Sequence, residues 1–130
     1  MKNTIFKVII YTYYLSLIVL LILYLFPGSL IGFLLYSDLG KQPNLISNPI
    51  GTSINHLIFF FYLGVLSFIT HFKHKKMIYS FPFLICISVL LEMLHLIIPN
   101  RAFELNDLFA NSAGVLSAFF TVFFIKKLKS

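Results

Sequence analysis

Residues 91–114, LEMLHLIIPNRAFELNDLFANSAG, join the end of one long apolar segment to the start of the next. The stretch holds three of the chain's four acidic residues, together with His95 and Arg101. The flanking apolar runs approach the ~20 residues that an α-helix needs to cross a bilayer. Polar residues confined to the junction of two such runs predict two membrane-spanning helices with a polar site at the end where they meet.

The composition of the whole chain favours a membrane protein. Of its 130 residues, 59% are hydrophobic and 11% are charged, and the mean hydropathy is +0.95. Soluble domains carry about 25% charged residues, and one of this size could not bury so much apolar surface. We therefore expect a single all-α domain with four transmembrane helices at about residues 5–26, 53–72, 78–98 and 106–125. Residues 30–36 are too short to span, and fit a short interfacial helix in the first outer loop.

The distribution of basic residues predicts the topology. Eight lysines lie at the N-terminus, in the loop at residues 71–76 and in the C-terminal tail, whereas the opposite connections hold only Lys41 and Arg101. By the positive-inside rule both termini are expected in the cytoplasm, with the protein in a bacterial cytoplasmic membrane. Lysine clusters beside apolar runs are also typical of contacts with anionic lipids. We expect membrane lipids as partners and no nucleic acid, and the sequence leaves the oligomeric state open.

This topology places several polar residues at one depth. At 1.5 Å per residue, the polar side chains of the second, third and fourth spans lie within roughly 10 Å of the outer boundary. Glu92 and His95 are three residues apart on one helix and can touch. A carboxylate inside a bilayer is costly, and by default it marks a functional site. The predicted ligand-binding or functional cluster comprises His56, Glu92, His95, Arg101, Asp107 and Asn111.

Structural roles compete with functional ones for the acids of this cluster. Glu92 could form an ion pair with His95 or Arg101 that locks helices together, and Asp107 in the first turn of a helix suits the helix dipole. Histidine and carboxylate side chains are also acceptable zinc ligands. Glu-x-x-His resembles the motif of di-iron bundles, but those need two copies and two further carboxylates. With one copy present, we expect neither a metal nor a cofactor, and the sequence identifies no catalytic residue.

The fourth span has a distinct packing face. Ala110, Gly114 and Ala118 form a ladder of small residues that lets a neighbouring backbone approach closely. At 100° per residue, Ser117 and Thr121 fall on the same arc as this ladder, opposite a face rich in phenylalanine. We expect this arc to face the inside of the bundle and the phenylalanines to face lipid.

The combination of these residues resembles the VanZ-like family. The resemblance rests on Glu92-x-x-His95 and on Pro99, Arg101, Phe103, Asp107, Asn111 and Gly114, preceded by His56, and it covers roughly residues 52–125. It implies a small multi-pass bacterial membrane protein, and the family's founding member is associated with resistance to the glycopeptide teicoplanin. The chain departs from the family pattern at two places. Thr52 and Ser53 stand where an Asp-Lys pair is frequent, and His95 stands where glutamine is frequent.

The expected function is therefore recognition of a cell-envelope component at the outer polar site. Arg101 suits a phosphate or carboxylate head group, the flanking helices suit a lipid tail, and the resemblance implies a link to glycopeptide susceptibility. One alternative is a membrane enzyme that acts on a lipid-linked phosphate, with His56 or Glu92 as acid or base. Another is a small transporter with Glu92 and His95 as a proton relay, and a third is a purely structural assembly subunit.

Overall fold

The chain is folded entirely from helices in the part that the structure describes. A computed structural model describes residues 2–44, 46, 51–72 and 74–129. The predicted all-α fold is confirmed, with helices α1 (Lys2–Leu25), α2 (Leu30–Tyr36), α3 (Gly51–Thr70), α4 (His74–Leu94) and α5 (Leu105–Lys129). All of these except α2 are long and apolar enough to cross a membrane. Lys73, one of the lysines in the predicted basic loop, lies outside the described residues.

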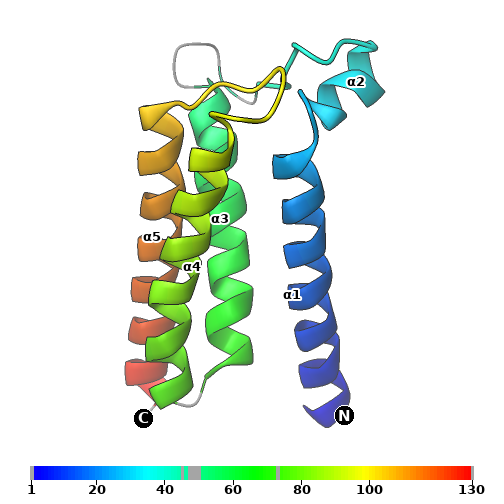
Figure 1. Ribbon diagram of the computed structural model, residues 1–130. Coiled ribbons are helices and arrows are strands. Elements are labelled where there is room, and N and C mark those ends of the chain that lie inside the picture. Colours follow the sequence, from blue (N-terminus) through cyan, green and yellow to red (C-terminus); the bar gives the residue numbers. More distant parts are fainter. Residues whose placement is uncertain (1, 45, 47–50, 73, 130) are drawn as a thin grey trace.

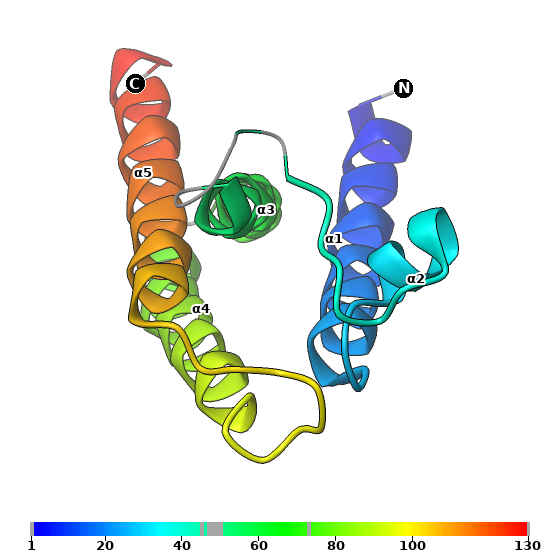
Figure 2. The ribbon, with the colours of Figure 1, turned by 90° about the horizontal axis from the view of Figure 1, so that it is seen from above.

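The four long helices run alternately up and down, so both ends of the chain lie at one end of the bundle (Figure 1). We call the opposite end the distal end. Helices α3, α4 and α5 pack together, and α1 stands on the other side of α3 (Figure 2). The connection between α4 and α5 extends across the distal end toward α1 (Figure 2). Segments from all parts of the chain therefore meet at the distal end.

The closest helix pair is α3 with α5, and small residues make it possible. A Cβ atom added at Gly114 would lie 2.5 Å from the carbonyl oxygen of Leu57, and one added at Gly64 would lie 2.7 Å from the Cβ of Ala118. Ala110 and Ala118 are buried on the same face of α5. The ladder of Ala110, Gly114 and Ala118 thus packs against α3, as the spacing predicts.

The predicted inner arc of α5 is wrong at its C-terminal half. Ser117 and Thr121 are exposed, and Val115 and Val122 are buried in their place. The Thr121 hydroxyl donates a hydrogen bond to the carbonyl oxygen of Ser117, one turn earlier in the same helix. A threonine satisfied within its own helix does not need a polar partner inside the bundle, so polarity alone misassigned this part of the face.

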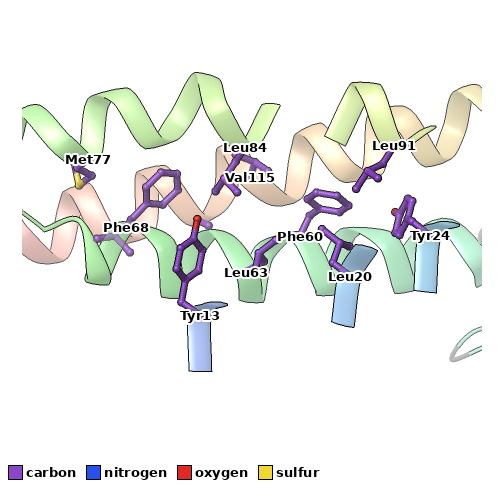
Figure 3. Packing of buried hydrophobic residues seen from close by; sticks show 12 residues of the cluster. Tyr13, Leu20, Tyr24, Phe60, Leu63, Phe68, Met77, Leu84, Leu91 and Val115 are labelled. Atoms are coloured by element: carbon purple, nitrogen blue, oxygen red, sulfur yellow. The ribbon is translucent and has the colours of Figure 1, made fainter. Parts of the chain in front are cut away.

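A single stripe of α1 faces the rest of the bundle. Tyr13, Ser16, Leu20 and Tyr24 recur at intervals of three and four residues and are all buried. Figure 3 shows Tyr13, Leu20 and Tyr24 directed into the core, which α3, α4 and α5 complete with residues such as Phe60. Most other large apolar side chains of α1 are exposed, as expected of a surface that faces lipid chains.

The third long helix differs from its expected bounds at both ends. It begins at His74, so Pro82 lies inside α4 and does not start it. Transmembrane helices tolerate an internal proline because local adjustments satisfy the freed carbonyl group. The helix ends at Leu94, before residue 98, and His95 lies in the tight turns that follow. The backbone N–H of His95 donates to the Glu92 carbonyl oxygen, which keeps the two residues together.

The first distal loop contains the expected short helix. Ser29 caps α2, because its hydroxyl accepts a hydrogen bond from the backbone N–H of Gly32. The backbone N–H of Ser29 donates to the carbonyl oxygen of Leu39, which folds the following segment back over α2. A Cβ at Gly32 would overlap the carbonyl of Lys41, so this residue must be glycine for the loop to close. The helix and its return segment form one wall of the site described below.

Candidate functional site

Tyr24 of α1 connects two residues of the predicted cluster. Its hydroxyl lies 2.8 Å from Nδ1 of His56 on α3 and donates a 3.0 Å hydrogen bond to Oδ1 of Asn111 on α5. The Tyr24 ring also stacks on His95, with the ring centroids 5.2 Å apart. One tyrosine therefore holds together groups from α1, α3, α5 and the turn after α4.

Asp107 joins the first turn of α5 to α3. Its Oδ1 accepts a 2.6 Å hydrogen bond from the hydroxyl of Ser53, and its Oδ2 lies 3.6 Å from Nε2 of His56. The carboxylate is buried, with 8% of the side chain exposed. Its position in the first helical turn also suits the helix dipole, as the structural alternative predicts.

Glu92 is fully buried and joins α4 to the start of α5. Its Oε1 lies 3.3 Å from Nδ1 of His95 and accepts a 3.1 Å hydrogen bond from the backbone N–H of Glu104. Its Oε2 has no hydrogen-bond partner among the described residues. The pairing of Glu92 with His95 is confirmed, and the bond to Glu104 explains how a buried acid fixes the loop between the helices.

Of the two alternative partners for Glu92, the described side chains show His95, and Arg101 forms no ion pair with an acid among them. Its Nε and Nη2 donate instead to the carbonyl oxygens of Phe26 and Leu23 at the end of α1. The last carbonyls of a helix lack partners within the helix and favour a nearby positive charge. Burial lowers the pKa of Arg101 from its ordinary value, but an arginine remains charged at neutral pH. Arg101 therefore caps α1 from the loop between α4 and α5.

Two adjoining cavities open beside these residues. The first, of about 130 Å³, has mainly apolar walls from α1, α2 and α3 that include Leu23, Leu30, Ile31 and Phe59. The second, of about 180 Å³, is lined almost entirely by polar residues: Gly40, Gln42, His56, His95, Asn100, Arg101, Ala102, Glu104 and Asp107. Gln42, His56 and Arg101 line both cavities. The distal end thus combines a polar chamber with an apolar groove.

The acidic residues at the polar chamber repel one another electrostatically. Burial, followed by the charges of Asp107 and Glu92, raises the pKa of Glu104 above its ordinary value. Negative charge at this end is therefore unfavourable unless a cation compensates it. Arg101 supplies one positive charge in the same wall.

The structure brings together the predicted residues and adds two that the sequence analysis omitted. His56, Glu92, His95, Asp107 and Asn111 converge, and Arg101 lies at the edge of the same chamber. The added residues are Tyr24 and Ser53. Tyr24 lies near the end of the first predicted span, at the same depth as the histidines and acids of the cluster. Its depth could therefore have predicted that it joins the site. Ser53 carried no comparable signal.

A buried polar cluster enclosed by four apolar helices defines a multi-pass, all-α membrane protein with a site at one end of its bundle. A comparison with protein-family models found no match, and neither the curated proteins nor the solved structures yielded a significant match.

Proposed function

We propose that the chain is a VanZ-like protein of the bacterial cytoplasmic membrane whose distal site binds the head group of a lipid or lipid-linked cell-wall precursor. In this proposal the termini lie in the cytoplasm and the distal end lies in the outer leaflet. A change in glycopeptide susceptibility is the expected cellular consequence. The observation that carries the proposal is the contact between the polar chamber and the apolar groove.

An amphiphile fits this arrangement better than a soluble molecule does. The polar chamber offers Arg101, whose two described hydrogen bonds go to neutral carbonyl groups and not to a carboxylate. The adjoining groove offers Leu30, Ile31 and Phe59. Sites for whole drug-sized ligands measure about 300–1,000 Å³, and each cavity is smaller than that. The pair therefore suits an anionic head group and the first part of its chain, with the remainder in the bilayer.

The lipid that stays with the protein tests this proposal. We expect native mass spectrometry of the protein in mild detergent to show a retained anionic lipid, and Arg101→Gln to reduce its occupancy at least tenfold. Lys126→Gln is the matched control, because Lys126 also donates to a carbonyl oxygen, that of Phe72, but at the opposite end of the bundle. Arg101→Lys keeps the positive charge and should retain part of the lipid binding. This variant distinguishes a loss of lipid caused by the missing charge from one caused by misfolding. Equal lipid occupancy in the Arg101→Gln and Lys126→Gln proteins contradicts the proposal.

The geometry favours binding over catalysis by His56. A general base needs a nitrogen within reach of the proton that it removes. Nδ1 of His56 contacts the Tyr24 hydroxyl, and Nε2, the nitrogen left to take a proton, faces the Asp107 carboxylate 3.6 Å away. A proton relay through the bundle is also disfavoured, since buried apolar residues such as Phe60, Leu63 and Leu84 fill the interior between the distal cluster and the other end.

Labelling of introduced cysteines tests the orientation. In a Cys86→Ala background, which removes the native cysteine, we expect Ala102→Cys to react with an impermeant thiol reagent on intact spheroplasts. Lys75→Cys, at the other end of the bundle, should react only after permeabilisation. Both positions are exposed on the protein. The opposite pattern would place the site in the cytoplasmic leaflet.

A further inference from the structure

Three potential metal ligands from three different helices converge at the distal end. One ligand atom each from His56, Glu92 and Asp107 lies within 4.8 Å of the others. Two ligands bound tetrahedrally to one zinc ion at about 2.0–2.2 Å lie roughly 3.3–3.6 Å apart. The three atoms therefore need to approach one another by up to about 1.5 Å to share an ion.

Each of these side chains is oriented by one atom and leaves another available. Tyr24 holds Nδ1 of His56, and Ser53 holds Oδ1 of Asp107. Oε1 of Glu92 is held by His95 and by the backbone of Glu104, while its buried Oε2 has no hydrogen-bond partner in the described part of the chain. Partners that fix one atom of a ligand and leave another free are characteristic of metal sites. An ordinary buried network would use both oxygens of Glu92.

The hydrogen-bond donors and acceptors of this network also indicate a positive charge between His56 and Asp107. The Tyr24 hydroxyl donates its hydrogen to Asn111, so its oxygen is left to accept from Nδ1–H of His56. Nε2 of a neutral His56 then presents a lone pair toward Oδ2 of Asp107, 3.6 Å away. Two acceptors that face each other repel unless a positive charge lies between them. Protonation of His56 supplies one such charge, and a metal ion supplies another.

We infer that His56, Glu92 and Asp107 bind a divalent cation of the zinc type. Imidazole nitrogen with two carboxylates suits Zn²⁺, whereas Mg²⁺ and Ca²⁺ prefer oxygen ligands alone. A divalent ion also compensates two carboxylates that are buried among apolar helices, where uncompensated charge is costly. All three ligands come from the protein, so an ion can bind without a lipid, although His56 and Asp107 also line the polar chamber.

Metal binding can be measured on the full chain in detergent, purified through a tag without histidine. After treatment with a chelator, we expect Zn²⁺ to restore one ion per chain by elemental analysis and to raise the melting temperature by several degrees. Co²⁺ should give the visible absorption of a bound ion, and Mg²⁺ should give neither effect. Asp107→Asn and His56→Ala should weaken Zn²⁺ binding at least 100-fold. Tyr24→Phe, which removes the hydroxyl that contacts His56 and Asn111 but keeps all three ligands, should weaken it 10–100-fold.

His71→Ala and Asp38→Asn are the matched controls, because they remove a histidine and an acid outside both the triad and the lining of the polar chamber. They should leave Zn²⁺ affinity unchanged. The inference is overturned if the folded wild-type protein binds no stoichiometric Zn²⁺, or if these controls lose as much affinity as the triad variants. If low pH stabilises the protein but neither Zn²⁺ nor the chelator changes its stability, a protonated His56 supplies the charge in place of a metal ion. If a ligand variant fails to fold, the Tyr24→Phe protein provides the test of Zn²⁺ affinity, because it keeps all three ligands.

Discussion

Glu92→Leu is expected to lower the free energy of unfolding by roughly 2–5 kcal/mol. The leucine fills a similar space but removes the acceptor for His95 Nδ1 and for the backbone N–H of Glu104. Both groups would then remain without that partner at the junction of α4 and α5. Denaturation in mixed detergent micelles, on protein treated with a chelator, measures the loss without any contribution from bound metal.

Two companion variants locate the origin of the effect. Glu92→Gln keeps an oxygen for the two donors and should lose clearly less stability than Glu92→Leu. Glu104→Gln changes an exposed acid whose backbone makes the same bond, and it should stay within about 0.5 kcal/mol of the wild type. If Glu92→Leu proves as stable as Glu104→Gln, the buried carboxylate does not hold the two helices together.

Gly114→Leu is expected to cost about 3 kcal/mol or more, the upper part of the range for overpacked interiors. Even the first carbon of the new side chain would lie 2.5 Å from the Leu57 carbonyl oxygen and 2.9 Å from the Phe61 nitrogen. These are backbone atoms of α3, so relief requires the two helices to separate. The melting temperature in detergent should fall accordingly, and Gly114→Ala should show a smaller decrease in the same direction.

Ser117→Leu provides the control on the same helix. Ser117 is exposed, and its carbonyl bond to Thr121 does not depend on its side chain. The variant should change stability by no more than about 0.5 kcal/mol. A loss equal to that of Gly114→Leu would mean that the small-residue ladder is not the contact between α3 and α5.

Much of the fold could be predicted because the membrane imposes strong rules on sequence. The four spans follow from the length of the apolar runs, and the short helix α2 follows from a run too brief to cross. The convergence of Glu92, His95 and Asp107 follows from their equal depth, since a bundle of antiparallel helices brings equal depths together. The helix bounds were less accurate, because the turn at His95 and the helical residues before Pro82 depend on local hydrogen bonds.

The partners of individual side chains could not be predicted in the same way. An ion pair between Arg101 and Glu92 was one of two alternatives because charge is visible in a sequence, whereas the unpaired carbonyls at the end of α1 are not. Tyr24 was omitted because tyrosine is common at membrane boundaries for its amphipathic ring alone. Ser117 and Thr121 were placed inside because a sequence does not show that a hydroxyl is satisfied within its own helix.

The contacts that hold α1 have a consequence for biosynthesis. This helix leaves the ribosome before α3, α4 and α5, yet Tyr24 binds residues 32 and 87 positions later, and the carbonyl groups near the end of α1 bind Arg101, 75 and 78 positions later. Until then, α1 resides in the bilayer as an apolar helix without its polar partners. A nascent chain that stops after α4 would lack Arg101 and Asn111 and would leave Tyr24 without one of its partners, so α1 gains its full set of polar contacts only once α5 has been made.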